Sequence, residues 1–329
     1  MINLSDSFFV AGHNGMVGKS IVRSLVRNGY ENILCESRNS LDLTNSENVE
    51  SWFKKNKPDV VIIAAAKVGG INANNIYPSE FILENLKIQN NIIESAWKNG
   101  SKRLLFLGSS CIYPKLSNQP IREEYLLDGD LEPTNEYYAI AKIAGIKLCQ
   151  ALRKQYGFDA ISIMPTNLYG PGDNYNLENS HVLPALIRKF YFATLENKSE
   201  VICWGTGKPL REFLHVDDLG DATLHVLKNF NPESTEFSQD LNFNGLNYLN
   251  VGTGKDIEIR KLAEIIAFHT GFKGEIIWDT TKPDGTPKKQ LDISRIQKLG
   301  WSPKIDLEQG IKDTLDHFIE SYNNGQIRN

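Results

Sequence analysis

The sequence has few cysteines and no long apolar run, and each shortage excludes a class of protein. Its four cysteines, at positions 35, 111, 149 and 203, stand far apart. They form no Cys-x-x-Cys pair and no His/Cys cluster, so we expect neither a disulfide framework nor a bound metal. We interpret them as free thiols and expect a cytoplasmic protein. No apolar run reaches the ~18 residues of a membrane-spanning helix.

An excess of positive charge is also missing. The chain carries 36 Lys and Arg against 40 Asp and Glu, a net charge of -4, which gives no reason to expect nucleic acid or an anionic membrane as a partner. The first residues, MINLSDSFFVAGHNG, have no basic segment ahead of the apolar ones, so we do not expect a signal peptide. The 329 residues are enough for one large or two modest domains.

A glycine-rich turn follows the first apolar stretch. Residues 7–11 predict a buried strand, and a helix is expected up to Arg27. Between them lie Gly12, His13, Asn14, Gly15, Met16, Val17 and Gly18. Glycines let the backbone approach phosphate oxygens, and a helix N-terminus favours negative charge, so this turn predicts a dinucleotide pyrophosphate site. Its spacing, Gly-x-x-Gly-x-x-Gly, differs from the common Gly-x-Gly-x-x-Gly fingerprint.

The end of the second predicted strand, 33–35, bears on the choice of cofactor. An acidic side chain at this position suits the ribose 2′-hydroxyl of NAD, whereas arginine suits the 2′-phosphate of NADP. Arg38, with Asn39 and Ser40 as further donors, favours NADP(H), and Glu36 argues for NAD. We favour NADP(H) and leave the choice open at this point.

Strands and helices alternate up to about residue 165. Residues 59–66 and 102–107 predict buried strands, and 81–99 a long helix. This alternation is typical of an α/β fold with a doubly wound parallel (Rossmann) sheet. Near-continuous apolar runs are expected of strands that are covered on both faces.

The pattern loosens beyond residue 171, which suggests a second unit. Two apolar stretches, 219–227 and 248–251, are candidates to return to the sheet, and the polar stretch 229–247 predicts a surface loop. We predict a Rossmann domain of residues 1–171 with returns near 215–255. Residues 172–214 and 256–329 would form a smaller C-terminal α/β lobe that binds the substrate.

One helix-forming stretch, residues 136–142, carries the clearest chemical pattern. Side chains four residues apart share a helix face, so Lys142 lies beside Tyr138, whereas Tyr137 has Ala141 at that offset. An ammonium beside a phenol favours phenolate, so we expect the pKa of Tyr138 to lie below its usual value near ~10. Such a phenol can protonate an alkoxide near neutral pH.

With the glycine turn, Ser109 and Tyr138-x-x-x-Lys142 in place, the chain resembles the extended short-chain dehydrogenase/reductases that act on nucleotide sugars. Further stretches are similar to the GDP-L-fucose synthase family, the GDP-4-keto-6-deoxy-mannose 3,5-epimerase–4-reductases. These stretches are 64–71, 107–115, 132–136, 165–171, 179–182, 211–218 and 282–287. The resemblance covers nearly the whole chain except 229–247 and the last ten or so residues.

This resemblance implies a two-step reaction on GDP-4-keto-6-deoxy-D-mannose. Cys111 and His181 would invert C3 and C5, and their reference pKa values, ~8.5 and ~6.5, bracket neutrality and suit proton transfer in both directions. NADPH would then deliver hydride to C4 while Tyr138 protonates the oxygen. Ser109 would be a second donor to that oxygen, and Lys142 would bind the nicotinamide ribose.

The resemblance also implies a set of binding residues. Beside the glycine turn, the cofactor would contact Arg38, Asn39, Leu107, Gly108, Ser109, Ser110, Lys142, Pro165, Thr166, Asn167, Leu168 and His181. The substrate GDP-sugar would contact Lys189, Trp204, Arg211 and Asp284. The guanidinium fork of an arginine suits a diphosphate. The family pairs the helices near 80–99 and 137–156 between two subunits, which implies a homodimer.

Three other functions stay open. A 4,6-dehydratase of the same fold needs an acidic pair beside the strand-end serine, where Cys111 and Ile112 stand. Another nucleotide-sugar 4-epimerase or reductase would have no need of Cys111 and His181. A non-catalytic regulator that senses dinucleotides could keep the glycine turn but has little use for Ser109, Tyr138 and Lys142 together.

Replacement of Tyr138 tests the predicted proton donor. We expect the Tyr138→Phe variant to reduce its keto sugar at least ~10²-fold more slowly, the scale of a lost general acid. The rate is followed by nicotinamide absorbance at saturating cofactor. A near-normal rate would mean that another group donates the proton.

Overall fold

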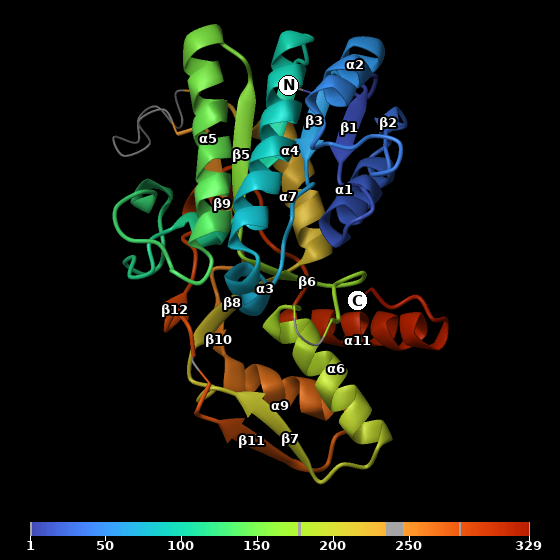
Figure 1. The fold of residues 1–329 in the computed structure, drawn as a ribbon, viewed down its shortest axis with the longest axis vertical. Helices are drawn as coiled ribbons and strands as arrows, with labels where there is room; N and C mark the ends of the chain where they lie inside the picture. The colour runs from blue at the N-terminus through green and yellow to red at the C-terminus, as the bar shows by residue number, and fades with distance from the viewer. Residues whose placement is uncertain (1, 177–178, 235–245, 283, 329) are drawn as a thin grey trace.

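The computed structural model describes residues 2–328 except 177–178, 235–245 and 283. Most of the predicted loop 229–247 therefore lies outside the described residues. The upper part of the molecule is built on a parallel sheet, and the lower part consists of helices and short strands (Figure 1). Among the described helices, none combines the length and the apolar character that a bilayer crossing requires.

The sheet of the upper part has six parallel strands in the order β2-β1-β3-β4-β5-β9. They are β1 (Phe8–Ala11), β2 (Ile33–Leu34), β3 (Val60–Ile63), β4 (Arg103–Leu107), β5 (Ala160–Pro165) and β9 (Tyr248–Val251). All except β2 are buried along their length, as apolar strands covered on both faces should be. The predicted doubly wound parallel sheet is confirmed. The strand order reverses between β1 and β3, where such folds bind their ligands.

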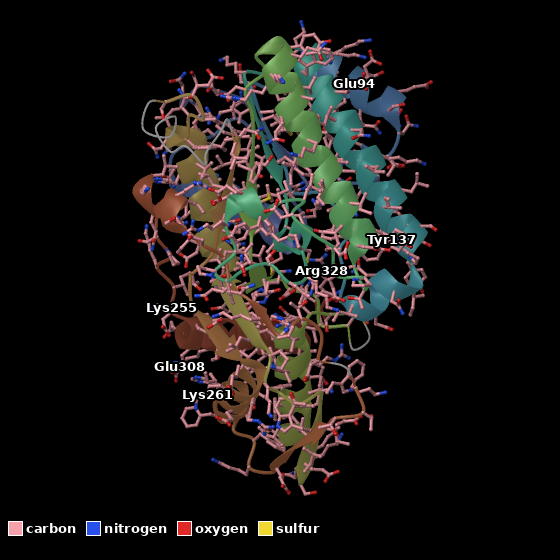
Figure 2. The ribbon with its side chains drawn as sticks, turned by 90° about the vertical axis from the view of Figure 1, so that its left-hand side faces the viewer. Glu94, Tyr137, Lys255, Lys261, Glu308 and Arg328 are labelled. Carbon is pink, nitrogen blue, oxygen red and sulfur yellow. The ribbon has the colours of Figure 1, made fainter. Side chains whose placement is uncertain are left out.

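Two groups of helices enclose this sheet. The helices α2 (Ser46–Asn56), α4 (Pro78–Lys98) and α5 (Glu136–Tyr156) pack side by side, and α1 (Met16–Arg27) packs on α7 (Val216–Asn229). Figures 1 and 2 show α5 and α4 on one side of the sheet and α7 on the other. The interpretation of residues 219–227 as a return to the sheet is wrong, because they form part of α7. Its apolar side chains recur with the helical period, whereas 248–251 does return as β9.

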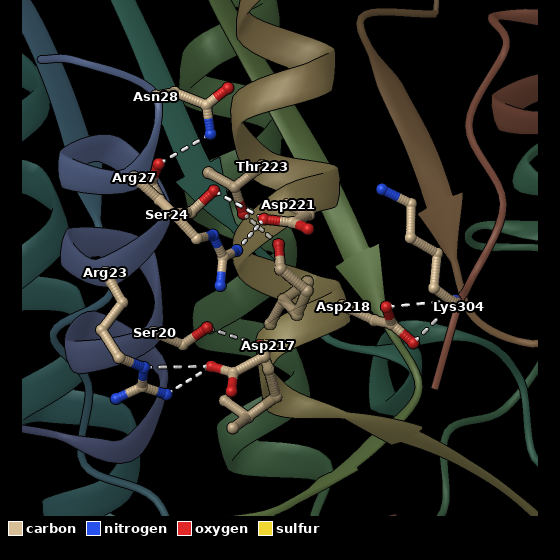
Figure 3. Close-up of polar contacts among 12 residues, drawn as sticks. Ser20, Arg23, Ser24, Arg27, Asn28, Asp217, Asp218, Asp221, Thr223 and Lys304 are labelled. Carbon is tan, nitrogen blue, oxygen red and sulfur yellow. Dashed lines mark hydrogen bonds and ion pairs between the residues drawn. The ribbon is translucent and has the colours of Figure 1, made fainter. Parts of the chain in front are cut away.

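Polar contacts join α1 to α7 along their length (Figure 3). The Ser20 hydroxyl donates to the Val216 carbonyl (2.7 Å), and the Ser24 hydroxyl donates to Asp221 (2.8 Å). Arg23 forms an ion pair with Asp217. The helix that follows the glycine turn is thereby fixed to the helix that follows β8 (Leu210–His215), which couples the turn to the lower part.

The lower part has a hydrophobic cluster of its own. It contains α6 (Val182–Leu195), β7 (Glu200–Trp204), α9 (Ile259–Thr270), β11 (Glu275–Asp279) and α11 (Leu307–Asn323). The strands β6 (Asn167–Tyr169), β8, β10 (Asp256–Glu258) and β12 (Lys288–Lys289) pair with one another near the carboxyl ends of the large sheet. Short helices complete the fold: α3 (Ile71–Ile76), α10 (Ser294–Lys298), η1 (Ser110–Ile112) and η2 (Glu123–Tyr125). The domain bounds that the sequence suggests stay a prediction.

Candidate active site

The backbone of the glycine turn packs so closely against neighbouring backbone atoms that two of its positions have no room for a side chain. Gly12 has φ +86°, and a Cβ there would lie 2.6 Å from the Ala65 nitrogen. A Cβ on Gly18 would lie 2.1 Å from the Gly12 carbonyl oxygen. Gly15 is the N-cap of α1, and the His13 Nδ1 atom is buried without a hydrogen-bond partner in the described part of the chain. A bare backbone at a helix N-terminus fits a dinucleotide pyrophosphate.

Glu36 and Arg38 follow β2, where the sequence predicts the ribose of the cofactor, and their side chains have different contacts. The Trp52 indole N–H donates to the Glu36 carboxylate (3.0 Å), and this bond, with one from Ser40, lowers the pKa of Glu36. Arg38 is exposed in the turn that follows, next to Asn39. A carboxylate already bound by its neighbours has less capacity for a ribose hydroxyl, so this arrangement favours a 2′-phosphate at Arg38.

Ser109 and Tyr138 meet where β4 ends. Ser109 is the N-cap of η1, and its hydroxyl accepts a hydrogen bond from the Cys111 backbone N–H (3.2 Å). Tyr138 lies in the first turn of α5, and a hydrogen bond with Ser109 acts to lower its pKa. Tyr137, the residue before it, lies on the outer side of α5 (Figure 2) and is 42% exposed. The sequence pattern therefore selected the tyrosine that faces the site.

The expected effect of Lys142 on Tyr138 is wrong for the free protein. The Lys142 ammonium lies 5.8 Å from the centre of the Tyr138 ring and donates instead to the Leu107 carbonyl (2.8 Å). Burial lowers the pKa of Lys142 to about 7. Burial, with the negative charge of Cys111, raises the pKa of Tyr138 more than the Ser109 bond lowers it. The two residues share a helix face as predicted, but the loss of water decides their protonation.

Cys111 lies against a residue that the sequence reasoning missed. The Lys289 ammonium donates to the Cys111 sulfur (3.3 Å). Burial acts to raise the pKa of Cys111, but the charge of Lys289 and hydrogen bonds from Ser109, Lys289 and Asn135 outweigh it, so the pKa is lowered. The available signal was the pair Lys288-Lys289, which stands directly after the family-like stretch 282–287.

His181 enters the same region from the lower part. It is the N-cap of α6, and the segment before it is anchored by a hydrogen bond from the Gly70 N–H to the Asn179 carbonyl (2.9 Å). The loss of water around its ring, together with the charge of Lys289, lowers the pKa of His181. The structure thus brings Cys111, Tyr138 and His181 together around shared neighbours. Their catalytic roles stay predictions.

The residues expected to bind the GDP-sugar fall into two places. Arg211, on β8, is close enough to Cys111, Glu132 and Asp284 that their charges act on its pKa, which burial lowers on balance. Trp204 is 62% exposed, so it is not a core residue.

A polar group around Trp204 forms the second place. The Lys189 ammonium lies 5.8 Å from the centre of the Trp204 ring and donates to the Ile202 carbonyl (3.0 Å). The Asp284 carboxylate accepts hydrogen bonds from the Thr206 N–H and hydroxyl, each 2.7 Å long. Asp284 therefore supports the loop after β7, in addition to any contact with a ligand.

The other predicted cofactor residues line the ends of β4 and β5. A Cβ on Gly108 would lie 2.3 Å from the Met164 sulfur, so the backbone after Leu107 packs closely on β5. The Asn167 amide and the Thr166 hydroxyl both donate to the Glu212 carbonyl, at 2.8 and 3.2 Å. Ser110 is buried, Pro165 ends β5, and Leu168 packs on the main core from β6.

Comparison with known proteins identifies the family. The profile of the NAD dependent epimerase/dehydratase family matches residues 8–238. Among solved structures, MlghC, a GDP-mannoheptose C4 reductase from Campylobacter jejuni with NADP bound, is 36% identical, has a TM-score of 0.86, and the match covers 97% of this chain and 100% of that one. The chain belongs to the NAD dependent epimerase/dehydratase family.

Its relatives narrow the assignment within that family. GDP-L-fucose synthase 1 of Arabidopsis thaliana is 54% identical over 98% of this chain and 95% of its own length. GDP-L-fucose synthase of Escherichia coli (strain K12) is 51% identical over 95% of this chain and 96% of its own length. The chain belongs to the GDP-L-fucose synthases. The family, the fold and the enzyme class predicted from the sequence are confirmed.

The buried amine of Lys142 can be tested by its effect on stability. Because its pKa in the folded protein lies far below its usual value of ~10.4, the unfolded chain binds more protons between about pH 7 and about pH 10. The free energy of unfolding of the free wild-type protein should therefore rise with pH relative to Lys142→Met, by up to ~5 kcal/mol at about 1.4 kcal/mol per pKa unit. Urea denaturation at several pH values measures this. Lys147→Met, at an exposed position of α5, is the matched control and should follow the wild type. Parallel pH curves for Lys142→Met and the wild type would contradict a buried neutral amine.

Proposed function

We propose that this protein converts GDP-4-keto-6-deoxy-D-mannose to GDP-L-fucose by inverting C3 and C5 and then reducing C4 with NADPH. The observation that carries the proposal is that Cys111 is close enough to Tyr138 for its charge to act on the phenol, while Lys289 contacts Cys111 and its charge also acts on His181. A thiol and an imidazole suit proton transfer at carbon, and a phenol suits protonation of an alkoxide. The relatives named GDP-L-fucose synthase support the choice of substrate.

The first stage uses the acidity that a C4 carbonyl gives to its neighbours. Loss of a proton from C3 or C5 leaves a carbanion whose charge is shared with the C4 oxygen. In the proposed mechanism, Cys111 and His181 serve opposite faces of the ring, so that one removes the proton and the other returns one with inverted configuration. Ser109 and Tyr138 donate hydrogen bonds to the enolate oxygen and stabilise its charge.

The second stage protonates the C4 oxygen. NADPH bound over the glycine turn supplies the hydride. Because burial raises the pKa of Tyr138, its phenol is protonated in the free enzyme, as a proton donor must be. Lys142, held by the Leu107 carbonyl, lies on the same helix face, where its protonated form stabilises the phenolate that remains. The raised pKa of Tyr138 thus agrees with the proposed role although it differs from the expectation drawn from the sequence.

The contacts of Glu36 and Arg38, and a similar solved structure, support a preference for NADP(H). Trp52 occupies the Glu36 carboxylate, and the exposed Arg38 can meet a 2′-phosphate. A GDP-L-fucose synthetase from Naegleria fowleri has been solved bound to NADP, at 28% identity and a TM-score of 0.86. We assign NADP(H) as the cofactor of this protein on these grounds.

For the nucleotide part of the substrate, we assign the diphosphate to Arg211 and the guanine to the Trp204 region. The Arg211 guanidinium offers a fork of donors and is close to the proposed sugar position at Cys111. The exposed Trp204 ring offers a stacking surface, with the ammonium groups of Lys189 and Lys282 near it. In this assignment the nucleoside diphosphate sugar extends from Cys111 past Arg211 to Trp204.

We also propose a cytoplasmic homodimer formed through α4 and α5. Both helices leave large apolar side chains exposed, among them Leu83 on α4 and Tyr137 and Ile140 on α5. The two helices lie side by side on the outside of the sheet (Figures 1 and 2). Burial of these side chains against a second copy would form a helical bundle between the subunits.

The direct test of the function is a reaction with the proposed substrate. Purified protein with GDP-4-keto-6-deoxy-D-mannose should oxidise NADPH faster than NADH, and NMR should identify the product as GDP-L-fucose. A product reduced at C4 with C3 and C5 unchanged would show a C4 reductase instead. Absence of nicotinamide oxidation would overturn the proposal.

The proposed role of Cys111 in epimerisation can be tested without the reduction step, by measuring hydrogen exchange in the absence of NADPH. In D₂O without NADPH, the wild-type protein should introduce deuterium at C3 and C5 of the keto sugar. We expect Cys111→Ala to lose this exchange, because its base is missing, while NADP binding persists. Cys35→Ala, which changes an exposed cysteine, is the matched control and should exchange normally. Unchanged exchange in Cys111→Ala would remove Cys111 from the mechanism.

A further inference from the structure

The backbone directly after Lys289 is held by hydrogen bonds on two sides. In the parallel pairing of β12 with β8, Lys289 lies opposite Arg211. The Leu291 N–H donates to the buried Glu212 carboxylate (2.7 Å), and the Gln290 carbonyl accepts from the Ile121 N–H (2.7 Å). The backbone that carries Lys289 is therefore fixed against the substrate strand on one side and the segment after Cys111 on the other.

The neighbouring residue, Lys288, is directed elsewhere. Successive side chains of a strand point to opposite faces. The Lys288 ammonium pairs with the Asp256 carboxylate (3.2 Å), whereas the Lys289 ammonium contacts the Cys111 sulfur (3.3 Å). The chain thus offers two adjacent lysines on one strand, of which only one contacts the thiol.

Charged and titratable groups face Cys111 from each element packed around it. They are Lys289 of β12, Arg211 of β8, Tyr138 of α5, and, through Lys289, His181 at the start of α6. The nearby Glu132 carboxylate is engaged by Lys115 (3.1 Å) and by the Thr286 hydroxyl (3.2 Å). Lys289 is the cation for which a direct contact with the sulfur is found among the described residues.

We propose that Lys289 is the positioning residue that keeps Cys111 in its thiolate form and so prepares it as the base of the epimerisation. This inference rests on the proposed function for its catalytic meaning, but the ion pair itself does not. An ammonium in contact with sulfur stabilises the thiolate directly, and most strongly where burial has removed water.

The same ammonium links the thiol to the imidazole. While Cys111 is a thiolate, its negative charge compensates that of Lys289, and His181 can hold a proton nearby. When the thiolate takes a proton from the sugar, the positive charge of Lys289 is no longer compensated, and it weakens the hold of His181 on its own proton. Proton uptake on one face of the sugar would thereby promote proton delivery on the other.

The reactivity of Cys111 tests the ion pair without any substrate. The proposed measurement is the rate at which iodoacetamide alkylates Cys111 in the folded full-length protein as a function of pH. Mass spectrometry of the peptide that contains Cys111 follows the reaction. Because alkylation requires the thiolate, loss of the lysine charge should raise the pH midpoint in Lys289→Met by about one unit and slow alkylation at neutral pH about tenfold. Lys288→Met should keep the wild-type profile, and Lys289→Arg should largely restore it.

Deuterium exchange at C3 and C5 supplies the second readout. Lys289→Met should exchange more slowly, with its pH midpoint shifted in the same direction, and Lys289→Arg should recover most of the rate. If Lys289→Met is alkylated with the wild-type pH profile, the proposal is overturned. If Lys289→Met does not fold, Lys289→Arg and Lys289→Gln test the proposal in its place. An effect of charge requires Cys111 to stay reactive toward iodoacetamide in the arginine variant and to lose reactivity in the glutamine variant. Absence of exchange in the wild type would reject the proposed function, while the alkylation profiles would still decide the role of Lys289.

Discussion

The hydrogen bond from the Lys142 ammonium to the Leu107 carbonyl is the contact on which the rest of the site depends. It joins α5 to the last residue of β4 at a buried position. Two residues further along the chain stands Ser109, and one turn back along α5 stands Tyr138. The donor pair for a C4 oxygen is therefore fixed by the end of one parallel strand and the first turns of one helix. The loss of water at this junction also sets the protonation of both Lys142 and Tyr138.

The lower part of the molecule contributes two positively charged side chains, Arg211 and Lys289, to the candidate site. Parallel strands that end at one edge of a sheet leave room there for a second set of strands, and β8 and β12 occupy it. Arg211 and Lys289 stand opposite each other on these strands, beside Cys111. The contacts between α1 and α7 tie β8 to the glycine turn, so the cofactor crevice and the substrate strand form one framework (Figure 3).

Local pattern was sufficient to predict the parallel sheet, whereas the roles of most candidate residues came from the family resemblance and stay predictions. Apolar runs gave the strands, and the i, i+4 offset distinguished Tyr138 from the exposed Tyr137. Three features were out of its reach, each for a physical reason. The pKa of Tyr138 depends on burial, which the offset does not reveal. Residues 219–227 are apolar enough for a strand but pack as a helix on α1. Lys289 contacts Cys111 although the two residues are far apart in the sequence, so no local pattern could predict the contact. The family resemblance covered residues 282–287 but not Lys289.

The central claim is that Cys111, His181 and Tyr138 act on C3, C4 and C5 of one bound sugar ring. A structure of the enzyme with NADP⁺ and GDP-L-fucose would test this claim most directly. The account predicts that the Tyr138 hydroxyl hydrogen-bonds to the sugar O4. It also predicts that the Cys111 sulfur and the His181 ring lie on opposite faces of the same ring, each about 3–3.5 Å from a carbon next to C4. A sugar ring out of reach of Cys111, or with both groups on one face, would contradict it.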